Sequence, residues 1–272
     1  MGFDDDIALR PTDDGAWEGE IAPGWHTPRG PLGGYVMAIL IHGLELAVDD
    51  SERTARSVTA HFLRPPVDGP VIVSAAVERA GRSLSTVSGR LEQGGKLIAV
   101  ALGAYSKPWP GPLLADVVMP EAEPAGRADR EPPPSQLGSE APPFIERLAM
   151  IPRFGERPFS GAARSEVGGW IGLRERRPLD AAAVAMLADA WFPAPWPRLV
   201  ELAPAPTIDL TVHFRAPLPL ADSLLLGRFR TRLVRDGFFD EEGELWTPDG
   251  ALVAQSRQFA LLIGARAPEQ PA

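Results

Sequence analysis

Hydrophobic and polar residues alternate along much of this chain, and the alternation predicts strands. The segments 57–65 (SVTAHFLRP) and 209–217 (DLTVHFRAP) show it most clearly. Such alternation is typical of a strand with one buried and one exposed face. In the first half of the chain we predict strands at residues 17–21, 58–63, 71–80, 83–93 and 96–105. In the second half we predict strands at residues 167–173, 207–214, 223–234, 237–246 and 251–262.

Two segments lack this alternation and are apolar on nearly every side, as in a buried helix. They are residues 34–47 (GYVMAILIHGLELA) and 181–192 (AAAVAMLADAWF). Asp189 is the only charged side chain of the second segment. A buried carboxylate is costly to desolvate without a hydrogen-bond partner, and the negative end of the helix dipole lies at this end of the segment. Asp189 therefore needs a structural partner or a chemical role.

The two halves of the chain resemble each other. The His-Phe pairs that begin at His61 and His213 are 152 positions apart, and the similar segments that begin at Gly95 and Gly250 are 155 positions apart. In each half, a Trp-containing strand, a helix and then several strands follow in the same order. This spacing argues for a duplicated unit, and a helix followed by antiparallel strands indicates an α+β fold.

A proline-rich segment separates these halves. Residues 107–143 contain ten prolines, a density that neither a helix nor a central strand tolerates. We therefore expect an N-terminal unit at 1–106, a linker at 107–143 and a C-terminal unit at 144–272.

Composition excludes several classes of protein. The chain has no cysteine, so disulfides and thiolate metal sites are excluded. Its net charge of −9 argues against a nucleic-acid partner. No apolar run is long enough to span a bilayer, and the acidic start of the sequence does not read as a signal peptide. We expect a cytoplasmic protein that does not insert into membranes.

Several motifs resemble the thioesterase II type of acyl-CoA thioesterase, a double hot-dog family. They are the segments 187–191 (LADAW), 207–214 (TIDLTVHF) and 252–258 (LVAQSRQ), together with the Gly33-Gly34-Tyr35-Val36 segment in the first half. The resemblance implies two tandem hot-dog units, each with a curled antiparallel sheet around a long helix. It also implies hydrolysis of an acyl-CoA thioester to a free acid and CoA, with no cofactor and no metal.

The resemblance further implies a catalytic set of Asp189, Thr207 and Gln258, which together hold and activate the attacking water. Gly33, Gly34 and Tyr35 then bind substrate, with free backbone N–H groups near Gly34 and Tyr35 facing the developing oxyanion. One departure is visible. Leu210 stands where the family often has a histidine, which leaves the substrate range open.

The residues themselves support one active site per chain. On the last predicted strand, Gln258 shares a face with small and apolar residues, so we expect a buried amide that needs partners. The equivalent position of the first half is Gly103, and the equivalent of Thr207 is Ala55. Asp209, on the strand face predicted to carry Thr207, is the rival candidate for the catalytic carboxylate.

Alternatives stay open at this level. His61 and His213 occupy equivalent places in both halves, which favours packing over catalysis. The arginines Arg64, Arg82 and Arg215 are equal candidates for contacts with CoA phosphates. A protein that binds acyl-CoA or its acyl chain without hydrolysing it fits the same pattern, as does a pure interaction module. Association into a homo-oligomer is also open.

Overall fold

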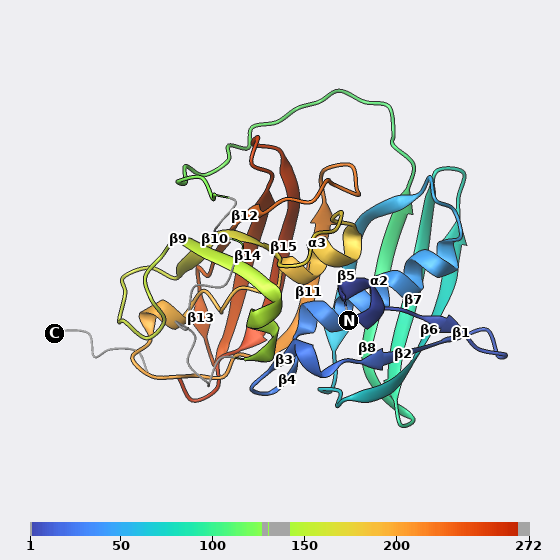
Figure 1. Cartoon of the computed structure of the whole chain (residues 1–272), viewed down its shortest axis with the longest axis horizontal. Coiled ribbons are helices and arrows are strands. Elements are labelled where there is room, and N and C mark those ends of the chain that lie inside the picture. The colour runs from blue at the N-terminus through green and yellow to red at the C-terminus, as the bar shows by residue number, and fades with distance from the viewer. Residues whose placement is uncertain (1, 127–129, 131–141, 266–272) are drawn as a thin grey trace.

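One antiparallel sheet of 13 strands runs through both halves of the molecule (Figure 1). The structure is a computed structural model that describes residues 2–126, 130 and 142–265. The strand order is β1-β2-β6-β7-β8-β5-β11-β15-β14-β12-β10-β9, and β13 pairs with β14. Read outward from its centre, the sheet repeats one order in both halves: β5-β8-β7-β6-β2 on one side and β11-β15-β14-β12-β10 on the other.

The predicted strands form with small shifts at their ends. In the first half they are β2 (Trp17–Ile21), β5 (Thr54–Phe62), β6 (Gly69–Ala80), β7 (Leu84–Gln93) and β8 (Lys96–Ser106). In the second half they are β10 (Glu166–Leu173), β11 (Thr207–Phe214), β12 (Leu225–Arg230), β14 (Phe238–Trp246) and β15 (Leu252–Leu261).

Other short elements were not predicted. Four are strands: β1 (Arg10–Pro11), β3 (His26–Thr27), β4 (Gly30–Pro31) and β9 (Leu148–Phe154). The predicted strand 223–234 is interrupted, and its end belongs to β13 (Val234–Arg235). Helix α1 (Phe3–Asp6) and the 3-10 turns η1 (Pro23–Trp25), η3 (Pro143–Arg147) and η4 (Trp196–Arg198) complete the list.

The predicted linker has no helix or strand over its described residues 107–126. Residues 127–129 and 131–141 of that segment lie outside the described residues. In the part of the chain that the structure describes, no helix combines the length and the apolar character that crossing a bilayer requires.

Strands β5 and β11 join the halves with a register that matches the sequence repeat. Thr59 lies opposite Thr211, its own equivalent in the other half, and the two side-chain oxygens are 2.9 Å apart. On either side, His61 pairs with Asp209, and Ser57 pairs with His213. The operation that maps one half onto the other also maps the first of these pairs onto the second. The halves are therefore related by an approximate two-fold axis between Thr59 and Thr211.

The predicted first helix is confirmed as α2 (Gly33–Val48), which packs on β6, β7 and β8 and on the second helix. The second helix, α3 (Ala181–Leu187), is shorter than the predicted 181–192. Beyond Leu187 the chain tightens into i→i−3 bonds from Asp189 to Met186 and from Ala190 to Leu187. The coming Pro193 also disfavours helical geometry at Phe192, so apolar character alone overestimated the helix.

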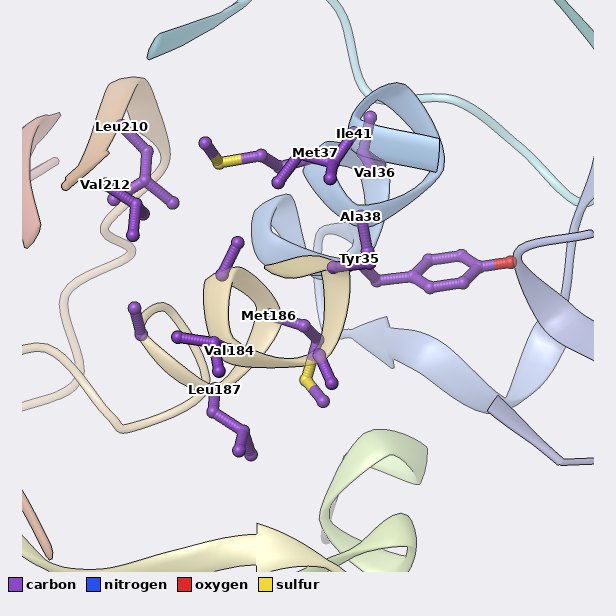
Figure 2. Close-up of a cluster of buried hydrophobic side chains, with 14 of the residues drawn as sticks. Tyr35, Val36, Met37, Ala38, Ile41, Val184, Met186, Leu187, Leu210 and Val212 are labelled. Atoms are coloured by element: carbon purple, nitrogen blue, oxygen red, sulfur yellow. The ribbon is translucent and has the colours of Figure 1, made fainter. Parts of the chain in front are cut away.

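Helices α2 and α3 share one hydrophobic core. Figure 2 shows side chains of α2, α3 and β11 gathered in this region, with Val184 and Leu187 of α3 below Leu210 and Val212 of β11. The largest cluster of buried apolar residues includes members from both halves. The halves are thus joined by the sheet on one side and by packed helices on the other, and the end of α3 meets the start of α2.

Candidate active site

Asp189 lies in the turn that follows α3, and its partner is the start of α2. The carboxylate atom Oδ2 accepts a hydrogen bond of 2.5 Å from the backbone N–H of Gly34. The first N–H groups of a helix have no partner inside the helix, and the helix dipole favours negative charge there. The C-terminal end of α3 disfavours the negative charge of Asp189, and the N-terminal end of α2 offsets this effect.

Burial still dominates the acidity of Asp189. Although part of its surface is exposed, the surrounding protein raises its pKa to about 7, against the opposing effect of the Gly34 hydrogen bond. Near neutral pH this carboxyl group is therefore divided between its acid and base forms, the range in which a general base works best.

Gly33 and Gly34 allow this close approach. A Cβ atom on Gly34 would lie 2.8 Å from the Asp189 Cβ and 2.8 Å from the Met186 carbonyl oxygen. A Cβ atom on Gly33 would lie 3.0 Å from the Asp189 Oδ2 atom. The glycine pair therefore brings two helix ends together and places the backbone of α2 against the carboxylate.

The side chain of Tyr35 lies in the core and not beside Asp189. The ring is fully buried and stacks on Trp25 at 5.3 Å between centroids. Its hydroxyl donates to the Asp6 carbonyl oxygen at 2.8 Å and accepts from the Ala22 N–H at 3.0 Å. Figure 2 shows this side chain directed away from α3. Tyr35 fixes the N-terminal segment to α2.

The predicted free N–H groups are also occupied. The Gly34 N–H bonds to Asp189, and the Tyr35 N–H bonds to the Leu32 carbonyl oxygen at 3.1 Å. Among the described residues, the Gly33 N–H is the one at this helix start without an acceptor. The sequence pointed to the helix start that Asp189 contacts, but it could not tell which amide this side chain would occupy.

Thr207 and Gln258 form a second pair. The Thr207 hydroxyl lies 3.3 Å from Gln258 Oε1, to which it donates. Gln258 is 9% exposed, as expected for a buried amide. Because its oxygen accepts from Thr207, its Nε2 hydrogens point elsewhere, and no described residue accepts them. This pair therefore offers a hydroxyl lone pair and an amide donor to a bound water.

A β-bulge places Thr207 on the inner face of the sheet. The register of β11 with β15 shifts between Thr207 and Asp209, so that Thr207 lies opposite the buried Ala260. Strict alternation would have placed Thr207 with Asp209 and Thr211, as the sequence predicted. That part of the prediction is wrong, because the bulge turns one side chain to the other face.

The same bulge removes the rival carboxylate from the inner face. Asp209 lies on the outer face beside Thr211 and the exposed His213, and all three line a groove of about 720 Å³. Gln258 borders this groove, but Asp189 does not line it. His61 is exposed as well, so the predicted packing role of the two histidines is wrong.

No hydrogen bond joins Asp189 to the Thr207–Gln258 pair, and the sequence analysis missed a carboxyl group that lies near both. Glu241 on β14 is buried and lies opposite Gln258 in register, and its carboxyl accepts the Ala194 N–H at 2.6 Å. Its pKa is raised by burial and by the charge of Asp189. Its position could have been found, since Phe239, Glu241, Gly243 and Leu245 share the apolar face of a predicted strand.

The described residues contain no group of three or more histidine, aspartate or glutamate side chains that could hold a metal ion.

Comparisons with known proteins agree with this fold. The model described as acyl-CoA thioesterase N-terminal domain matches residues 21–106, and the model described as acyl-CoA thioesterase C-terminal domain matches residues 120–262. No curated protein matches this chain in sequence.

Solved structures match nearly the whole chain. A conserved hot-dog protein of unknown function from Alicyclobacillus acidocaldarius is 25% identical, with a TM-score of 0.83 and 98% of each chain covered. A putative thioesterase II from Thermobifida fusca is 28% identical, with a TM-score of 0.74 and coverage of 96% of this chain and 97% of that one. In fold, acyl-CoA thioesterase II TesB2 from Mycobacterium marinum is also similar, with 22% identity, a TM-score of 0.73 and full coverage of both chains.

These findings define the class of enzyme to which the protein belongs. The hot-dog fold, together with the matched acyl-CoA thioesterase domain models, is that of a thioesterase enzyme. Because the two family models together span most of the sequence, the chain belongs to the acyl-CoA thioesterase family.

Proposed function

We propose that this protein hydrolyses acyl-CoA thioesters to a free acid and CoA, with a water molecule activated by Asp189 and held by Thr207 and Gln258. The observation that carries the proposal is the Asp189 carboxylate, which accepts the Gly34 N–H at the start of α2 and has a pKa of about 7. A carboxylate with this pKa takes a proton from water more readily than an exposed one.

In the proposed reaction, the water oxygen attacks the thioester carbonyl carbon while Asp189 accepts one water proton. The Thr207 hydroxyl and the Gln258 amide orient the water, so that the attack begins from a fixed geometry. The carbonyl oxygen gains negative charge, and the unoccupied Gly33 N–H at the start of α2 is placed to stabilise it. When the carbon–sulfur bond breaks, the CoA thiolate takes the proton from Asp189, which restores the base.

We also propose the finer architecture. The repeated strand order and the two-fold pairing of β5 with β11 support two hot-dog units at 1–106 and 144–272, joined by a linker at 107–143. The first unit wraps around a long helix, whereas the second has only the short α3. A cytoplasmic location and association into oligomers remain predictions from the sequence.

The test is the release of free thiol from a panel of acyl-CoAs from short to long chains. We expect turnover by the wild type and a loss of kcat of about 10³-fold in Asp189→Asn, which keeps the shape of the side chain but cannot accept the proton. Asp209→Asn is the matched control, because Asp209 lies on the outer face of the sheet.

Asp209→Asn should keep kcat within about twofold of the wild type, as expected for a surface substitution. A fully active Asp189→Asn would overturn the assignment of the base. A tight acyl-CoA complex without any turnover would instead support a binding protein.

A further inference from the structure

A second carboxyl group, Glu241, lies beside the proposed site, and the hydrolytic mechanism above does not use it. It is 6% exposed. Its Oε2 atom accepts the Ala194 N–H at 2.6 Å, and Ala194 comes only five residues after Asp189. Glu241 therefore ties the segment that follows α3 to the inner face of β14.

Glu241 is also a direct neighbour of Gln258. The two residues lie opposite each other on β14 and β15, and side chains of opposite residues in an antiparallel pair point to the same face about 5 Å apart. Ala194 on one side and Gln258 on the other connect Glu241 to both parts of the proposed site.

Among the described residues, Asp189 is the charge that acts on Glu241. On the adjacent strands, the inner face carries Phe229 from β12 and Ser256 and Ala260 from β15, none of which is charged. The charged neighbours Asp240, Glu242 and Arg257 alternate to the opposite face and pair with one another there. Within the part of the chain that the structure describes, no cation offsets the burial of Glu241.

Burial and the charge of Asp189 both oppose the ionisation of Glu241. Burial raises the pKa of Glu241 to about 8, and the negative charge of Asp189 contributes to the rise. The pKa of Asp189 is about 7. The negative charge of Asp189 opposes the ionisation of Glu241, so Glu241 keeps its proton to a higher pH than an isolated carboxyl group does.

We propose that Glu241 is a positioning residue whose carboxyl group holds the Ala194 amide and so the turn that carries Asp189, and that the negative charge it gains on ionisation stops hydrolysis at alkaline pH. The proposal rests on the proposed function. Its physical reason is that the transition state places negative charge on the carbonyl oxygen, and a second carboxylate in a low-dielectric site disfavours that charge.

The first experiment measures kcat and kcat/KM for thiol release between about pH 5.5 and 9.5 in the wild type and in three variants. The wild type should show activity that rises through about pH 7 and falls above about pH 8. Glu241→Gln keeps an acceptor for the Ala194 N–H but cannot ionise. We expect its kcat at pH 7 to drop about threefold and its alkaline decline to disappear.

Glu241→Leu removes the acceptor as well, and its kcat should drop about 30-fold at every pH because Asp189 is no longer held in place. The control is Glu244→Gln, a change of the same type on the opposite face of β14, which should keep the wild-type profile. An alkaline decline that persists in Glu241→Gln, or equal activity of the Leu and Gln variants, would overturn the proposal.

The second experiment does not depend on turnover, so it separates this proposal from the proposed function. The carboxyl carbon of Glu241, assigned by its loss in Glu241→Gln, is titrated by ¹³C NMR in the wild type and in Asp189→Asn. We expect a midpoint near pH 8 in the wild type and a lower one in Asp189→Asn, because the charge of Asp189 is gone. Equal midpoints would show that the carboxyl groups are not coupled, and the proposal would fail even if the wild type hydrolyses acyl-CoA.

Discussion

The two halves of the molecule have the same strand order and equivalent pairings, yet only the second carries the polar set. Val58 pairs with Gly103 in the first half as Leu210 pairs with Gln258 in the second. Both halves even contain a register shift at the equivalent place on β5 and β11. The backbone was therefore kept in both copies, and the side chains differ.

At the positions of the proposed site, the first half is small or apolar. Gly103 stands in place of Gln258, and Val87, which pairs with Gly103, stands in place of Glu241. The first half contributes instead the start of α2, whose Gly34 amide binds Asp189. One half supplies the reacting groups and the other supplies a helix terminus, so the site needs both. This division explains why the chain has one proposed site and not two.

The largest effect is expected from a substitution that introduces into the first half a carboxyl group that only the second half has. Val87 is fully buried, and a glutamate there would have no counterpart of the Ala194 N–H. We expect Val87→Glu to lower the free energy of unfolding by about 3–5 kcal/mol, the cost of an uncompensated buried charge. Urea unfolding monitored by circular dichroism measures this change.

Val77→Glu on β6 is the control for Val87→Glu, because Val77 is 41% exposed. It should change the free energy of unfolding by less than about 0.5 kcal/mol. Equal stability of the two variants would mean that the first half tolerates a buried carboxyl group, and that the polar set depends less on its surroundings than we argue.

A smaller effect follows from making the second half resemble the first at Gln258. Gln258→Ala removes the amide that orients water, and we expect kcat to fall about 100-fold, in the range found for the loss of one oriented donor. Gln255→Ala, on the same strand but in register with the outer-face residue His213, should keep the wild-type kcat within about twofold.

Thr207→Ala should lower kcat by about tenfold, and its effect should be less than additive with that of Gln258→Ala, because the two side chains are hydrogen-bonded. Fully additive losses, measured in the double variant, would show that Thr207 and Gln258 act separately.

An effect on activity as small as that of Thr207→Ala is expected at the contact between the halves. Gly34→Ala would bring a Cβ atom to 2.8 Å from both the Asp189 Cβ and the Met186 carbonyl oxygen. We expect a loss of about 1–3 kcal/mol in the free energy of unfolding, as for other overpacked sites. Displacement of Asp189 should also lower kcat by about tenfold.

Gly111→Ala is the matched control for Gly34→Ala, since no atom lies within 4 Å of the added Cβ. Thermal unfolding and thiol release should both match the wild type. An unchanged Gly34→Ala would mean that α2 and α3 can separate without consequence for Asp189.

The sequence by itself determined the elements and the repeat. Alternation and apolar runs are local properties, so they located the main strands, the first helix and the two equivalent halves. Asp189 was also visible, because a single carboxylate in an apolar segment is costly wherever that segment packs. The resemblance added Thr207 and Gln258, which the structure brings within hydrogen-bond distance.

Only the tertiary structure decided how these residues meet. The bulge that separates Thr207 from Asp209 breaks the two-residue period on which the face prediction depended. The end of α3 is set by its contact with α2 and by the following proline, not by hydrophobicity. The partner of Asp189 is a backbone amide 155 residues away. Glu241 becomes a neighbour of Gln258 only when β14 lies beside β15. Such contacts depend on which strands and helices pack together, and a local sequence pattern does not specify those partners.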